Sequence, residues 1–159
     1  MKRWIVLVSL LLLLASCGNK DTLTTLADPV PDQTIPSHNE GISLELLQDV
    51  FDESPTHIKT KVANTTTNSF EIGPFYHIEV WKDDHWYILT YSDAVFLRDP
   101  HFRDGGSELT AHQEIQQTFS VEDLGIRLPA GTYRLVKTVL QRNPYHEVTV
   151  SATFIVQEM

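Results

Sequence analysis

The residue with the clearest chemical context is Cys17, the single cysteine of a 159-residue chain. It follows two basic residues near the start and an apolar run from Trp4 to Leu14. A membrane-spanning helix needs about 20 apolar residues, so this run is too short to cross a bilayer but has the length of a signal-peptide core. Small residues, Ala15 and Ser16, separate the run from the cysteine. The sequence therefore predicts a cleaved leader over residues 1–16.

The four residues Leu14, Ala15, Ser16 and Cys17 resemble the lipobox of bacterial lipoproteins, in which an aliphatic and two small residues precede the cysteine. The resemblance implies that Cys17 carries a diacylglyceryl group, usually with an N-acyl chain, and becomes the first residue of the mature protein. Two or more buried lipid chains suffice for stable anchoring to a membrane. The alternative is an ordinary secretory leader with a cysteine at this position by chance.

The other chemistry-bearing residues form no recognisable catalytic or metal-binding pattern. Seven histidines are spread along the chain without a His-x-His pair, the spacing that places two ligands on one face of a strand. The adjacent acids Asp83 and Asp84 lie in a polar turn, where solvation explains them. The sequence contains no Gly-x-Ser-x-Gly motif and no glycine-rich phosphate loop. We therefore expect a protein that is not an enzyme and has no cofactor or resident metal.

The charge of the chain argues against one class of partner. It has 12 Lys and Arg against 21 Asp and Glu, a formal charge of −9. Removal of the leader takes Lys2 and Arg3 and no acid, which leaves 10 basic and 21 acidic residues and a charge of −11. Such a surface repels phosphate backbones, so we expect no nucleic-acid binding.

The candidate binding loop is the long connection over residues 92–111. Loops beyond about 12–15 residues without secondary structure are uncommon and are often functional. Beside a glycine pair, this loop offers aromatic, cationic and imidazole side chains, namely Phe96, Arg98, His101, Phe102 and Arg103. The alternative is a surface crossover whose aromatic residues cover one end of the domain.

Three aromatic residues, Trp81, Trp86 and Tyr87, bracket a predicted turn at residues 82–85. Exposed on a surface, they would suit contact with carbohydrate or protein, because aromatic rings bury a large area at low entropic cost. Alternation along a strand places Trp86 and Tyr87 on opposite faces. We therefore expect at least one of the three in the core, most often a tryptophan.

The elements that would position these groups are strands. Apolar and polar residues alternate over residues 42–46, 57–64, 76–81, 115–119 and 148–156, and β-forming residues fill 131–140. Only Val121–Leu124 suggests a helical turn. About seven strands at this spacing predict an antiparallel sandwich.

The segment between the leader and the first strand has no periodicity and contains Pro29, Pro31 and Pro36. Proline disfavours helix and cannot donate to a sheet, so we expect a disordered tether with a reach of about 25 Å. The chain thus divides into a signal peptide at residues 1–16, a lipidated tether at 17–40 and one folded domain at 41–159.

The stretch Leu128-Pro129-Ala130-Gly131-Thr132-Tyr133-Arg134-Leu135 resembles the tyrosine corner of immunoglobulin-like domains, in which a tyrosine hydrogen-bonds back to the preceding loop. Antibody domains carry a cysteine two residues after this tyrosine. Leu135 stands there instead, which suggests an apolar contact in place of the disulfide.

Together with the strand that ends at Asn64 and the hairpin around residues 82–87, this stretch resembles the bacterial immunoglobulin-like domains of many Gram-positive lipoproteins. The resemblance covers roughly 115 residues, from Ile42 to Val156. It implies an immunoglobulin-like β-sandwich and, by analogy alone, a binding module on the extracytoplasmic face of a Gram-positive plasma membrane.

Three functions remain open at this point. The first is a membrane-anchored interaction module that binds an envelope protein or a glycan. The second is a regulator, such as a protease inhibitor, that inserts the 92–111 loop into its target. The third is capture of a small ligand or metal.

Overall fold

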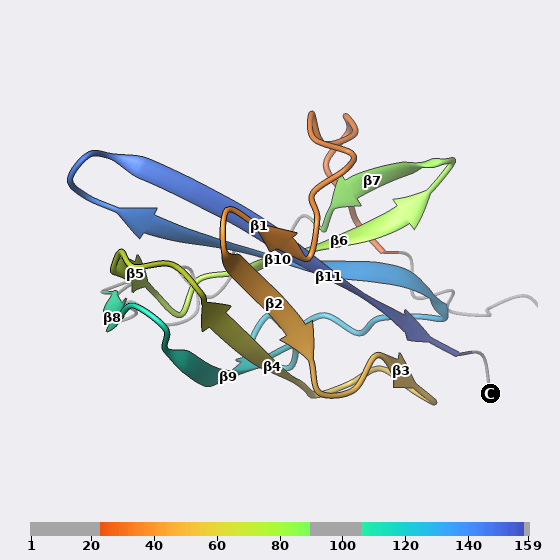
Figure 1. The fold of residues 1–159 in the computed structure, drawn as a ribbon. Coiled ribbons are helices and arrows are strands. Elements are labelled where there is room, and N and C mark those ends of the chain that lie inside the picture. Colours follow the sequence, from red (N-terminus) through yellow and green to blue (C-terminus); the bar gives the residue numbers. More distant parts are fainter. Residues whose placement is uncertain (1–22, 90–105, 158–159) are drawn as a thin grey trace, which may run out of the picture.

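The computed structural model describes residues 23–89 and 106–157. Within these ranges the chain is all-β, with eleven strands in two facing sheets (Figure 1). None of the described segments forms a helix long and apolar enough to cross a membrane. The expected sandwich class is confirmed.

The smaller sheet is antiparallel throughout and has the strand order β1-β2-β4-β9. Its strands are β1 (His38–Asn39), β2 (Ile42–Leu46), β4 (His57–Asn64) and β9 (Glu114–Ser120). The alternation in the sequence correctly identifies their inner face. Ile42, Ile58 and Val62 are fully buried, whereas the alternate residues Ser43, Lys59 and Lys61 reach the surface to varying degrees.

The larger sheet is built on a long antiparallel hairpin of β10 (Gly131–Gln141) and β11 (His146–Val156). The outer edge of β11 pairs in parallel with the short strand β3 (Val50–Phe51). Two different partners share the other edge of β10. Residues 133–136 pair with β6 (His77–Lys82), which forms a hairpin with β7 (His85–Ile88). Further along, Leu140 pairs with β5 (Phe70–Ile72), which pairs with β8 (Ser107–Leu109).

One apolar cluster fills the space between the sheets. Val148, Val150 and Phe154 of β11 are buried in it, as their alternation predicts. The ring of Tyr133 stacks on Phe154 with the two centroids 5.4 Å apart. Leu135 is fully buried in the same cluster, at the position where an antibody domain carries cysteine.

The tyrosine corner predicted from the sequence is present. The Tyr133 hydroxyl donates a hydrogen bond of 2.6 Å to the backbone carbonyl of Pro129, four residues upstream. Burial raises the pKa of the Tyr133 phenol, so the hydroxyl keeps its proton and remains a donor. The bond fixes the entry of β10 to the loop before it.

Tyr133→Phe should therefore lower the free energy of unfolding by about 1 kcal/mol, the usual net value of one hydrogen bond. The ring and its stacking on Phe154 stay in place, so only the corner bond is lost. Urea unfolding of the two proteins measures the difference. Equal midpoints and slopes would show that the corner contributes nothing to stability.

Residues 23–40 do not form the free tether expected from the sequence. Thr25 bridges Leu89, and the amides of Leu26 and Val30 donate to carbonyls of β7 at 2.9 and 3.0 Å. Proline is compatible with this edge position because Leu26 and Val30 supply the backbone N–H donors. The Pro36 carbonyl acts as an acceptor, with the Ser151 amide nitrogen 2.9 Å away. The folded unit therefore begins by residue 23 rather than at 41.

Residues 30–36, which we call the strap, cross the outer face of the larger sheet from β7 to β11. Backbone carbonyls of the strap accept from Arg134 on β10 and from the Ser151 hydroxyl on β11. The chain then enters β1 and joins the smaller sheet (Figure 1). A segment expected to hang free thus ties the two sheets together.

Two further expectations are wrong in detail. Part of the predicted 92–111 loop is the strand β8, which pairs with β5. Residues 121–125 form hydrogen-bonded turns rather than a helical turn, with the Gly125 amide bonded to the Glu122 carbonyl at 2.8 Å. Strands of three residues are too short to show a period, which explains why β5 and β8 escape a pattern search.

Candidate functional site

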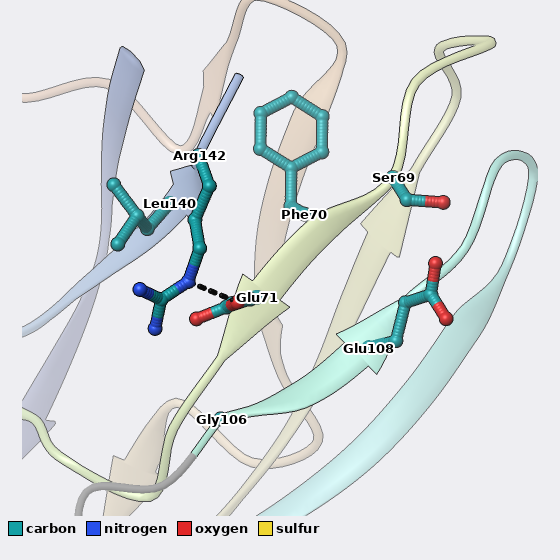
Figure 2. A pocket seen from close by; sticks show the side chains of 7 residues that line it. All are labelled: Ser69, Phe70, Glu71, Gly106, Glu108, Leu140 and Arg142. Carbon is teal, nitrogen blue, oxygen red and sulfur yellow. Dashed lines mark hydrogen bonds and ion pairs between the residues drawn. The ribbon is translucent and has the colours of Figure 1, made fainter. Parts of the chain in front are cut away.

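The main candidate site is a cleft where the described part of the 92–111 segment rejoins the sandwich (Figure 2). It has a volume of about 320 Å³ and is formed by β5, β8 and the end of β10. Its walls consist of Ser69, Phe70, Glu71, Gly106, Glu108, Leu140 and Arg142. The apolar wall residues belong to the sandwich, and the charged ones open to solvent.

Charged groups dominate the mouth of the cleft. Figure 2 shows the Arg142 side chain reaching Glu71, and its Nε donates to the Glu71 carboxylate. This hydrogen bond lowers the pKa of Glu71 and raises that of Arg142. Both groups are accessible, with 36% of the Glu71 side chain and 73% of the Arg142 side chain exposed. Screening by water keeps the stabilising effect of such a pair small.

A second carboxylate lies beside the first. Glu108 on β8 is directly opposite Glu71 on β5 in the strand register. Opposed like charges on neighbouring strands repel each other. Arg142 compensates one of the two carboxylates, so the other remains available to a positively charged group.

Gly106 permits the close approach of β8 to β5. A Cβ atom at this position would lie 3.0 Å from the Cβ of Glu71 and 3.4 Å from the amide nitrogen of Ile72. A larger residue at this position would therefore require β5 to shift by a few tenths of an ångström at the cleft.

The β6–β7 hairpin carries the second feature of interest. Asp83 and Asp84 form its two-residue turn with φ of 51° and 60°, the left-handed geometry that tight hairpins require. The indole rings of Trp81 and Trp86 lie on one face with their centroids 5.2 Å apart. The guanidinium carbon of Arg134 lies 4.7 Å from the centroid of the Trp86 ring, within cation–π range.

A buried ion pair lies next to these rings. Arg134 Nε donates to Glu79 Oε2 at 2.5 Å, and the two residues are 2% and 1% exposed. His77 contacts the other Glu79 oxygen at 2.9 Å. Arg134 also donates to the strap carbonyls of Asp32 and Gln33 at 2.8 and 3.3 Å. All sides of the pair are thus satisfied by hydrogen bonds, as a buried charge pair requires.

Residues 38–155 match the family of bacterial Ig-like domains. The chain belongs to that family. A comparison with curated proteins found no match. The Ig-like family match begins at β1 and ends one residue before the end of β11, so it covers almost all of both sheets.

The Ig-like domain departs from expectation at its aromatic hairpin. Neither tryptophan is in the core, since Trp81 is 43% exposed and Trp86 is half-buried on the outer face. Tyr87 is half-buried and packs against the core from the other face. Trp86 and Tyr87 therefore face opposite sides of the sheet, as predicted. The prediction of a tryptophan in the core is wrong, because both indoles lie on the outer face of β6 and β7.

The sequence pattern did not reveal that Glu79 is buried. Alternation correctly places Glu79 on the outer face of β6, where a solvent-exposed side chain is expected. Glu79 is instead 1% exposed and paired with Arg134, which the strap holds in place. The five side chains proposed for the binding loop, and the lipobox with Cys17, lie outside the described residues. Among the residues that the structure describes, no three His, Cys, Asp or Glu side chains gather as a metal site.

Proposed function

We propose that the protein is a lipoprotein anchored through Cys17 to the extracytoplasmic face of a cell membrane, where its Ig-like domain binds an envelope protein or a surface glycan. The observation that carries this proposal is the short distance along the chain between the lipobox and the fold. Six residues lead from Cys17 to Leu23, where the described domain begins. They can span at most about 20 Å, so a lipidated Cys17 would hold the domain against the membrane surface.

The cleft is well placed for a partner in this arrangement. The N-terminal residues of the fold lie beside β7, whereas the cleft lies at the other end of β10. Tyr133, which pairs with β6, and Leu140, which pairs with β5, are separated by about 23 Å along the strand. The cleft would therefore face away from the anchor, where another component of the envelope can reach it.

The chemistry of the cleft favours a partner with positively charged groups. The mature chain would carry a net charge of −11, and Glu108 adds an exposed carboxylate at the cleft. Opposite charge speeds association and sets the orientation of a bound partner. We propose binding without chemical conversion as the activity. A protease-inhibitor-like role would depend on the 92–111 loop, of which residues 92–105 lie outside the described ranges.

Site-specific photo-crosslinking in intact cells tests this function. A photoreactive residue replaces Ser69 at the wall of the cleft in one strain and Thr118 in a second; both positions are exposed, and Thr118 on the smaller sheet serves as the matched control. We expect a discrete crosslinked species from position 69 that is absent from position 118. Substitution of Glu108 by lysine should weaken the crosslink, because it replaces the carboxylate available to a positively charged group with a like charge. Equal yields from both positions, or none from either, would contradict binding at the cleft.

A further inference from the structure

The outer face of the β6–β7 hairpin carries a continuous row of apolar side chains. Trp81 is directly opposite Trp86, and Ile88 lies two residues after Trp86 on the same face of β7. Leu26 is hydrogen-bonded to Ile88 through its amide, which continues the row onto the N-terminal segment. We call Leu26, Trp81, Trp86 and Ile88 the tryptophan face. The other faces of these strands carry Tyr87 and Leu89, which pack against the core.

The tryptophan face is partly open to solvent. Leu26 is 47% exposed and Trp81 is 43% exposed, while Trp86 and Ile88 are half-buried. Its rim is polar and of mixed charge, because Lys82 and Asp83 of the turn are 59% and 74% exposed at their side chains. Indole rings with an apolar body and an N–H donor are favoured at the interface between lipid tails and headgroups.

The tryptophan face lies close in the chain to the proposed lipid anchor. Leu26 is nine residues after Cys17, and Trp86 lies on β7, the strand to which the N-terminal segment is hydrogen-bonded. A lipid anchored at Cys17 would keep the face within about 20 Å of the bilayer through the residues up to Leu23. Such tethering gives a high effective concentration, so even a weak affinity of the face for lipid suffices for contact.

We propose that the tryptophan face lies on the headgroup layer of the membrane that holds the anchor, with the indoles of Trp81 and Trp86 in the interfacial zone. This inference rests on the lipid anchoring proposed above. It converts a single point of attachment into two, which fixes the orientation of the domain. Figure 1 shows the turn between β10 and β11 at the opposite end of the molecule from the β6–β7 hairpin, so that turn and the neighbouring cleft lie far from the proposed contact.

Tryptophan fluorescence is the direct test, because the mature chain retains only Trp81 and Trp86 once Trp4 leaves with the leader. The lipidated protein is reconstituted into phosphatidylcholine vesicles with and without bromine on the upper part of the acyl chains. We expect the brominated lipid to quench most of the emission. Flotation of the vesicles is measured on the same samples and shows independently whether the protein is anchored.

A relocated reporter provides the matched control. Trp81→Phe and Trp86→Phe are combined with Tyr145→Trp, which places the only tryptophan at an exposed position in the β10–β11 turn. Its emission should be insensitive to bromine. Protein that floats but is quenched equally at both positions, or at neither, would overturn the membrane contact and leave the anchoring intact. Protein that does not float would overturn both proposals.

Discussion

Replacement of Arg134 by alanine is expected to lower the free energy of unfolding by about 3–5 kcal/mol. The substitution removes the partner of a Glu79 carboxylate that is 1% exposed, and leaves a charge inside the protein with only His77 beside it. It also removes the guanidinium that holds the strap through the carbonyls of Asp32 and Gln33. Urea unfolding gives the change in stability, and limited proteolysis should cut the strap first.

A matched double variant separates the cost of an unpaired charge from loss of packing. Glu79→Leu combined with Arg134→Met removes both charges and retains apolar volume. Such replacements of a buried pair are often neutral, so the double variant should be clearly more stable than Arg134→Ala. A loss of less than about 1 kcal/mol in Arg134→Ala would show that water reaches Glu79 and that the strap does not seal the pair.

Asn64→Ala should be the second most damaging substitution, with a loss of about 3 kcal/mol. The Asn64 side chain is buried at the end of β4, and its amide nitrogen donates to the carbonyls of Asn68 and Thr110 at 2.7 and 2.9 Å. Its oxygen accepts from the amide and hydroxyl of Thr66 at 2.9 and 2.8 Å. Alanine would leave several of these groups without a partner at the junction of the two sheets.

Asn68→Ala is the control, because Asn68 is exposed and contributes only backbone groups to this network, its carbonyl to Asn64 and its amide to Thr66. A surface change of this kind should alter stability by less than about 0.5 kcal/mol. Urea unfolding measures both variants, and hydrogen exchange at Thr66 reports on the turn itself. Similar losses from the two substitutions would assign the effect to the turn backbone rather than to the Asn64 side chain.

Asn64 illustrates what a sequence pattern reveals and what it omits. Its place on the inner face of β4, with Ile58 and Val62, follows from alternation. Its role as a hydrogen-bonding centre does not, because the partners lie in a turn four residues on and in another at residue 110. The tyrosine corner was predictable for the opposite reason, since Tyr133 and Pro129 are neighbours in the chain.

The strap shows the main limit of compositional reasoning. Three prolines and a lack of periodicity indicate a tether, and nothing local records that carbonyls in this segment meet Arg134 and Ser151 more than 100 residues away. The same limit applies to the cleft. Glu71, Glu108 and Arg142 come from three separate strands or turns, and only the register of β5 with β8 and β10 brings them together.

These contacts give the Ig-like domain two distinct ends. The N-terminal segment and the tryptophan face lie around the β6–β7 hairpin, and the charged cleft lies toward the β10–β11 turn. A short lipidated link at the first end would leave the second end exposed to the envelope. Anchoring and recognition would then involve separate surfaces, so a substitution at one should leave the other unaffected.

Lipid attachment at Cys17 is the central claim and can be measured directly. Cells that produce the wild-type protein or Cys17→Ser are grown with a labelled fatty acid and fractionated. We predict that the wild-type protein carries the label and remains with the membranes. Cys17→Ser should carry no label and should be released or left unprocessed. Equal labelling of the two proteins, or wild-type protein that is unlabelled and soluble, would contradict the account.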